Sequence, residues 1–531
     1  MKRHIILAAA FLLPLGLGAQ NLNPEVQVTN EYETRINDVA KQGPAMTVPD
    51  SMLHFNYHFD YSVFESPYKG AYEFSPYSVM ITPAAGAYDG RKLYLRAGAG
   101  WVLKPELDLV WSALDRKRAA VNVFATGRGF YGNYLKIAED TFVADKGTLY
   151  NGWDFNPVAG VDARFNIDRS VLRAELAYEG LFTGHELYHN AVGHAPYAHI
   201  SLGNDEPYGF TYRADVRYRY VNDTLEGWAP QQDHDVKATL MVSPYISERL
   251  RIGFDLDFVY NNAYTGFEGH PSVQFGEGVW DFEAGFRLGW KSYYTNVLDI
   301  SPALKVNCSL LDRHLVLYAG AVGKNNMLSY WDYKTMAHRY FMSYETPRSV
   351  REIADLYLGA RGFTGFGLRA DLKAGYVFIE DAPLWTVSAT GGETLTFNSF
   401  GMLHADLDFA WSNKRVDVQG AVHYNWLPEG VEERVFMPAA VRADLKASYN
   451  WMKRIYAGIS GNMSTSRSAV VNSTTVELPW YLDLGVWGEY KFNDKLGVWL
   501  KGSNLLNHQI RQSPMYCQYG PSAIAGITLS L

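Results

Sequence analysis

The chain has 531 residues and a formal net charge of −8 at pH 7, from 48 lysines and arginines against 56 aspartates and glutamates. No basic stripe marks it as a nucleic-acid partner, and no run of about eighteen apolar residues after the first twenty positions predicts a membrane helix. Aromatic residues make up 15% of the chain, which favours a protein with rings at membrane interfaces over an ordinary soluble domain.

The first twenty residues have the order of a secretory signal peptide. Lys2 and Arg3 precede an apolar run, Ile5–Leu17, and small residues follow it. A basic start, a short apolar core and a small-residue cleavage site direct export. We therefore expect residues 1–20 to be removed, which leaves the periplasm, the outer membrane or the outside of the cell as locations.

Residues 21–91 differ from the rest because prolines recur between short apolar stretches. Each proline removes a backbone donor, which disfavours a regular sheet. The sequence predicts an extended segment, periplasmic or lumenal, ahead of the main domain at 92–531. The prolines are Pro24, Pro44, Pro49, Pro67, Pro76 and Pro83.

From residue 92 onward, apolar and polar residues alternate in many short segments. Residues 368–374 read Leu-Arg-Ala-Asp-Leu-Lys-Ala, and 403–411 and 441–451 follow the same alternation. A period of two residues is that of a strand with one apolar face. The sequence therefore predicts an all-β fold, a transmembrane antiparallel β-barrel of about 16–20 strands.

The predicted strands lie at 92–101, 105–115, 118–130, 156–168, 170–182, 209–223, 233–246, 248–261, 278–293, 295–310, 314–325, 353–365, 366–381, 401–413, 415–427, 439–451, 454–466, 480–494, 496–507 and 522–531. Short charged turns join some pairs. Long connections, expected at 131–155, 183–208, 326–352 and 382–400, join others. Short periplasmic turns and long extracellular loops are typical of bacterial outer-membrane barrels. The assignments between 209 and 293 do not fit this alternation of sides.

The C-terminal segment resembles the last two strands of TonB-dependent receptors. Val498–Asn507 is an alternating strand that ends Asn-Leu-Leu-Asn, where that family has N-L-x-N or N-L-x-D, and a final alternating strand follows from Gly520 to Leu531. The opening Leu22–Glu33 is similar to plugless TonB-receptor-like barrels of the Bacteroidota. The resemblance implies a bacterial outer-membrane barrel of that type.

TonB-dependent receptors carry a plug domain before the barrel. Residues 21–91 are too short for it and show no glycine-rich βαβ pattern. Glu25–Thr29 resembles a TonB box, but an ordinary extended strand is the simpler interpretation. We expect a barrel without a plug, with outer-membrane lipids and periplasmic or surface lipoproteins as partners, and without TonB.

Residues 185–189 read His-Glu-Leu-Tyr-His. On a helix, His185 and His189 would share a face and hold zinc, with the glutamate as a base. The segment lies in a predicted loop, so a plain loop is the preferred interpretation, metal binding is the second and proteolysis the last. No other nucleophile, histidine and acid combine into a catalytic set, and we expect neither an enzyme nor a cofactor.

Charges on the polar face of four neighbouring predicted strands would line one lumen wall. Mixed signs predict a hydrated pore wall or a salt-bridged wall that closes it, and a wall that only keeps the lumen wet fits the sequence equally. These residues are Arg369, Asp371, Lys373, Asp406, Asp408, Arg415, Asp417, Arg442, Asp444 and Lys446.

The leading functional hypothesis is passive or partner-assisted passage of a solute across the outer membrane. The alternative is a structural or accessory subunit of an outer-membrane protein complex, and a barrel hydrolase comes third. Cys308 and Cys517 are far apart, and we expect two lone thiols rather than a disulfide. The sequence names no substrate.

Overall fold

The structure, a computed structural model, describes residues 92–138, 141–186, 190–204, 209–247, 249–293, 296–312, 314–336, 347–387, 393–427 and 432–531. The expected signal peptide and the N-terminal segment, with its TonB-box-like stretch, lie outside these residues. Among the helices described, none is both long and apolar enough to cross a membrane.

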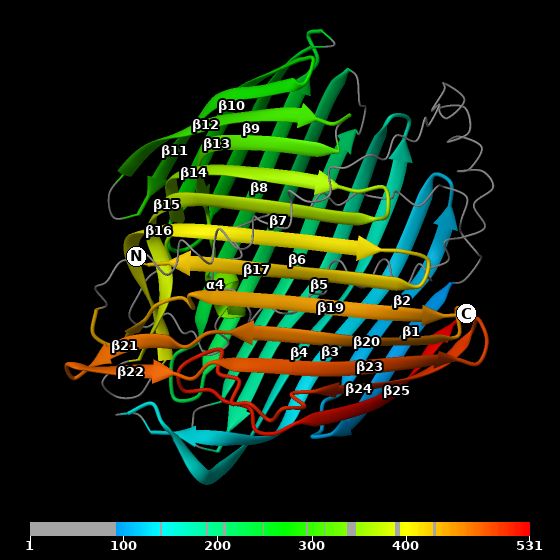
Figure 1. Ribbon diagram of the computed structural model, residues 1–531, viewed down its shortest axis with the longest axis vertical. Helices are drawn as coiled ribbons and strands as arrows, with labels where there is room; N and C mark the ends of the chain where they lie inside the picture. Colours follow the sequence, from blue (N-terminus) through cyan, green and yellow to red (C-terminus); the bar gives the residue numbers. More distant parts are fainter. Residues whose placement is uncertain are drawn as a thin grey trace, which may run out of the picture. The chain divides into compact units, whose positions relative to one another are not determined.

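A single antiparallel sheet of 22 long strands closes on itself as a barrel. The first strand, β1, pairs with the last, β25, from Tyr94 opposite Ser530 to Trp101 opposite Ala523, so the blue and red strands lie beside each other in Figure 1. Closure leaves no open edge, and every backbone group can be satisfied within the sheet. The predicted transmembrane barrel fold is confirmed.

The barrel strands are β1 (Leu93–Trp101), β2 (Glu106–Arg116), β3 (Ala119–Ile137), β4 (Ala144–Ile167), β5 (Ser170–His185), β6 (Ala191–Asn204), β7 (Phe210–Leu225), β8 (Gln231–Pro244), β9 (Leu250–Tyr260), β10 (Thr265–Glu277), β11 (Trp280–Ser292), β12 (Asn296–Leu310), β13 (Leu315–Asn326), β14 (Val350–Phe363), β15 (Leu368–Val387), β16 (Glu393–Ser412), β17 (Val416–Trp426), β19 (Val441–Trp451), β20 (Ile455–Ser464), β23 (Tyr481–Lys491), β24 (Leu496–Ser503) and β25 (Ser522–Ser530). The connections carry helix α4 (Tyr330–Met336), the short strand β18 (Val435–Phe436), and a hairpin of β21 (Arg467–Val471) and β22 (Thr474–Leu478).

The strand number exceeds the predicted range because the structure has two further strands, β6 and β10, between the predicted ones. Each contains a proline, Pro196 or Pro271, which has no backbone donor for the ladder. In the structure, pairing to the following strand skips Ala195 with Pro196, and His270 with Pro271, and resumes in the same register. Adding these two strands removes the conflict of sides near 209–293.

Two of the expected long connections, 131–155 and 382–400, are shorter than predicted. β3 and β4 continue into residues 131–155, and β15 and β16 continue into 382–400. At one end of the barrel, the turn side, every connection between strands is five residues or shorter, whereas the other end, the loop side, carries the long connections 327–349, 427–440 and 504–521 together with short ones such as 261–264. At the turn side, Met452 and Lys453 both have positive φ, of 54° and 57°, as the two central residues of a type I′ turn require.

The apolar face of the strands points outward. Leu372 is 51% exposed and Leu445 is 41% exposed, whereas Asp371, next to Leu372 on β15, is only 7% exposed. Alternate side chains of a strand lie on opposite faces. Leu372 and Leu445 therefore lie on the outward, apolar face, as the barrel predicted from the alternation requires.

A tryptophan packs over glycines where the barrel closes. The ring of Trp499 on β24 is 3% exposed, and a Cβ added to Gly98 on β1 or to Gly526 on β25 would lie 2.5 Å from it. The guanidinium of Arg96 stacks on the same ring, 4.3 Å from its centroid. The glycines are needed here because the ring leaves no space for side chains at those positions.

Candidate functional site

The inner face of β14–β17 carries a connected group of ionisable side chains. His404 on β16 lies between two carboxylates, with Nε2 2.9 Å from Oδ1 of Asp355 and Nδ1 3.0 Å from Oδ2 of Asp406. The other oxygen of Asp406 lies 2.8 Å from Nδ1 of His423 on β17. Both ring nitrogens of His404 are thus held by acids, and the imidazole has one orientation.

Basic side chains balance these acids. Lys373 on β15 donates to Oδ2 of Asp355 over 2.5 Å. Asp371, two residues earlier, accepts hydrogen bonds from the hydroxyl of Tyr318, at 2.5 Å, and from Nε of Arg361. We call the set of residues in these two paragraphs the inner wall. Its mixed signs and its mutual contacts make it a polar, hydrogen-bonded surface.

The residues predicted to line the lumen share one strand face, except Arg415, which lies in the turn between β16 and β17. Cross-strand pairs join Asp371 with Asp408, and Lys373 with Asp406, and the next pairs continue to β17 and β19. Asp371, Lys373 and Asp406 belong to the inner wall. The others lie around it: Asp444 accepts from Asn462 at 2.6 Å, Asp417 accepts from Ser412 near the turn side at 2.5 Å, and Arg369 and Lys446 are exposed.

Sequence reasoning missed part of this group. Asp355, Arg361 and Tyr318 lie on predicted strands, and the same period of two residues that selected Asp371 places them on the polar face. His404 and His423 follow that period as well. What alternation cannot give is their contact with residues on neighbouring strands, because contact depends on the register between strands.

Helix α4 crosses from β13 to a distant part of the inner face. Trp331 donates its indole N–H to Oε2 of Glu179 on β5 over 2.7 Å. Lys334 Nζ lies 2.9 Å from Oδ2 of Asp223 on β7, and that carboxylate also accepts from the hydroxyl of Tyr330. Since β5 and β7 are six or more strands away from β13, α4 reaches them only through the barrel interior.

Asp332 of α4 forms ion pairs with basic side chains on β8 and β7. Lys237 on β8 donates to Asp332 over 2.5 Å, and Arg219 on β7 lies 3.9 Å from that carboxylate. Burial alone would raise the pKa of Asp332, but Lys237, Arg217 and Arg219 outweigh it and hold the pKa well below its usual range. We call α4 with its contacts on β5, β7 and β8 the α4 latch.

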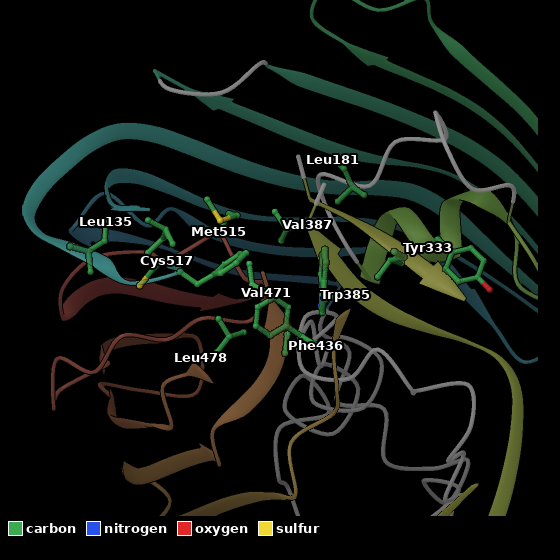
Figure 2. Close-up of a cluster of buried hydrophobic side chains, with 14 of the residues drawn as sticks. Leu135, Leu181, Tyr333, Trp385, Val387, Phe436, Val471, Leu478, Met515 and Cys517 are labelled. Atoms are coloured by element: carbon green, nitrogen blue, oxygen red, sulfur yellow. The ribbon is translucent and has the colours of Figure 1, made fainter. Parts of the chain in front are cut away.

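A hydrophobic cluster spans the loop side (Figure 2). It contains Leu181 of β5 and Leu395 of β16, and these strands are eleven places apart in a ring of 22 (16 − 5 = 11). Opposite walls of the barrel therefore meet in one apolar core through the loops between them. Its other buried members are Leu135, Ile137, Phe142, Ala144, Ala195, Val221, Tyr330, Trp331, Tyr333, Trp385, Val387, Phe436, Ala469, Val471, Leu478, Met515 and Cys517.

Two arginines tie the loops of this core together. Nη1 of Arg467, on the hairpin, donates to the carbonyl of Gln512 at 3.0 Å, and Arg511 donates to the carbonyl of Phe142 over 2.5 Å. Burial lowers the pKa of Arg467 to about 10 and raises the pKa of the Cys517 thiol to about 11. Cys517 and Cys308 are both free thiols.

The histidine motif does not begin on a helix. His185 is the last residue of β5, and its ring packs against Tyr134, Tyr150 and Tyr516 at centroid distances of 4.9, 5.9 and 5.3 Å. His189 lies outside the described residues. In the part of the chain that the structure describes, no three histidine, cysteine or acidic side chains are arranged to hold a metal ion.

Several solved structures share this barrel. The siderophore receptor PirA from Acinetobacter baumannii superposes with a TM-score of 0.62 at 9% identity, over 83% of this chain and 80% of that one. A copper transporter, OprC, gives 0.61 at 10%, over 83% and 80%, and an FrpB iron transporter from Neisseria meningitidis gives 0.61 at 10%, over 83% and 81%. These neighbours are TonB-dependent receptors. At identities this low, the superposition shows a common fold and nothing further.

No protein-family model matches the sequence, and no curated protein matches it.

Proposed function

We propose that this chain is an outer-membrane barrel that passes a polar solute through its lumen, and that its own loops close the loop side at rest. The observation that carries the proposal is the joining of opposite walls, β5 and β16, in one core across the loop side. A polar inner wall stands behind that core. The fold shared with a siderophore receptor and with copper and iron transporters supports the same reading.

The inner wall favours a hydrophilic solute. Its carboxylates, imidazoles, lysine and arginine present donors and acceptors of both signs. A hydrated solute can exchange water for such groups at little cost, whereas an apolar one would leave them unsatisfied. We propose passage without a plug and without TonB; the prolines of residues 21–91, each of which lacks a backbone donor, support this because they disfavour a regular plug sheet.

Planar bilayer recording tests this function. The wild-type barrel should give a small steady conductance or none. Glu179→Gln combined with Asp223→Asn removes both carboxylates that hold Trp331 and Lys334, so this release variant should conduct more. Asp444→Asn, which changes one inner-face carboxylate away from α4, is the matched control and should behave as wild type.

A release variant that folds but conducts no more than wild type would contradict passage through the lumen. Folding is checked by heat-modifiable gel mobility, since closed barrels resist detergent until heated. That outcome would favour a structural subunit of an outer-membrane complex instead.

A further inference from the structure

The turn side of the barrel is charged unevenly. Nine exposed cations lie on neighbouring turns and strand ends from β16 round to β3: Lys414, Arg415, Lys453, Arg454, Lys495, Lys92, Arg116, Lys117 and Arg118. The same segments carry three exposed acids, Asp115, Asp417 and Asp494. We call the nine cations the basic arc.

Backbone hydrogen bonds place these turns side by side. The carbonyl of Arg415 accepts from the amide of Asn450 at 2.7 Å, and the carbonyl of Arg454 accepts from Lys491 at 2.8 Å. The carbonyl of Lys495 accepts from Ser530 at 2.8 Å. The cations therefore form one continuous surface along the barrel rim rather than scattered charges.

The opposite part of the rim differs. The described turn residues between β8 and β13 include Arg249, which is paired with Glu277 at 3.0 Å, and the acids Asp281 and Asp312. By contrast, no cation of the basic arc forms an ion pair with any residue that the structure describes. Self-repulsion among so many unpaired cations is unfavourable unless an anion lies against them.

Outward-facing apolar side chains stand directly beside the basic arc. Trp451 and Phe492 are exposed on the lipid face, and Met452, in the turn between Trp451 and Lys453, is 78% exposed. Aromatic rings at strand ends mark the membrane interface, and long basic side chains next to them reach the phosphate level of the lipid. The anion that fits this place is a lipid phosphate.

We propose that the basic arc binds the head groups of anionic phospholipids in the leaflet around the turn side. The cations of neighbouring turns would contact phosphates of adjacent lipids, while Trp451 and Phe492 would pack on the glycerol and acyl region. Such binding fixes the tilt and depth of one wall of the barrel in the membrane.

Native mass spectrometry of the purified barrel tests this proposal by counting bound lipids. Wild type should retain phosphatidylglycerol in preference to phosphatidylcholine, with a preference that falls as salt rises. Replacing Lys414, Arg415, Lys453 and Arg454 with glutamine should weaken phosphatidylglycerol retention by about tenfold. Exchanging lysine for arginine, and arginine for lysine, at the same four positions keeps the charge and should keep the preference.

Arg249→Gln, on the opposite part of the rim, should also keep the preference for phosphatidylglycerol. Equal retention of both lipids by wild type, or an unchanged preference in the glutamine variant, would overturn the proposal. If the glutamine variant loses heat-modifiable mobility and the exchange variant does not, lipid retention is measured on the folded fraction of the glutamine variant. A fall in phosphatidylglycerol retention by that fraction supports the proposal. If the purified barrel binds an acidic periplasmic protein through the basic arc but shows no preference between the two lipids, the proposal is overturned as well.

Discussion

The indole Nε1 of Trp331 lies 2.7 Å from Oε2 of Glu179, although 152 positions separate the two residues in the sequence. The contact joins a loop helix to the inner face of β5. Glu179 also lies 3.1 Å from Arg219, so the tryptophan binds an acid that a cation already orients. This geometry makes α4 a part of the barrel interior and not a free loop.

Trp331→Phe keeps most of the apolar surface but removes the donor to Glu179. We expect docking of α4 to weaken by about 1–3 kcal/mol, since a hydrogen bond to a charged group is lost. The measurement is the thermal transition of the loop side, followed by tyrosine and tryptophan fluorescence. Tyr333→Phe, which removes a hydroxyl that donates to a backbone carbonyl, at Arg348, is a control from the same helix and should have a smaller effect.

Acid should loosen the α4 latch. The pKa of Asp332 is well below its usual range because Lys237, Arg217 and Arg219 outweigh burial. A carboxyl with a depressed folded pKa stabilises docking fully above its unfolded value of about 3.9, and this contribution is lost as pH falls from there through the folded pKa. Docking followed by fluorescence should therefore be flat from neutral pH to about 4 and weaken below.

In Asp332→Asn the group no longer titrates, so docking should be weaker at neutral pH and should change less on acidification. An acid dependence as steep as in wild type would show that another group controls it.

The two strand faces should respond oppositely to charge. Leu372→Arg or Leu445→Arg places a cation on the lipid face and should destabilise the barrel by about 2–4 kcal/mol near mid-membrane. Asp444→Asn should fold normally because its partner is a neutral amide, on Asn462. Unfolding in urea from lipid vesicles gives both values. Harmless arginine variants would mean that the faces are reversed.

Asp371→Asn should not be as mild as Asp444→Asn. Asp371 is 7% exposed and accepts from both Arg361 and Tyr318, and removing its charge leaves the guanidinium without its acid. The alternation of charges alone does not distinguish the two aspartates, since both occupy polar positions of equivalent strands. The register of β14 against β15 makes the difference.

The sequence predicts the elements of this barrel better than their contacts. Alternation locates twenty of the strands and misses β6 and β10, each of which contains a proline, Pro196 or Pro271. The seven residues of α4 are too few to show helical periodicity. Its contacts with Glu179 and Asp223 depend on the closure of the sheet, which brings distant strands to one interior.

Energy coupling gives a test of the N-terminal segment. Deleting Glu25–Thr29 should leave solute passage unchanged, because we expect no plug that TonB could pull. Uptake by cells with and without the proton gradient is the measurement. If uptake needs both the gradient and these five residues, the chain is a TonB receptor and the plugless interpretation is wrong.

Blocking the lumen tests the central claim most directly. The background is the release variant with Cys308→Ser, and Cys517 is kept because it is buried. One cysteine is then introduced, either in place of Asp408 on the inner face or in place of Leu372 on the lipid face. A bulky thiol reagent is then added during bilayer recording. Modification at position 408 should reduce the conductance, and modification at position 372 should not. Equal effects at both positions, or no effect at 408 despite complete labelling, would contradict passage through the lumen.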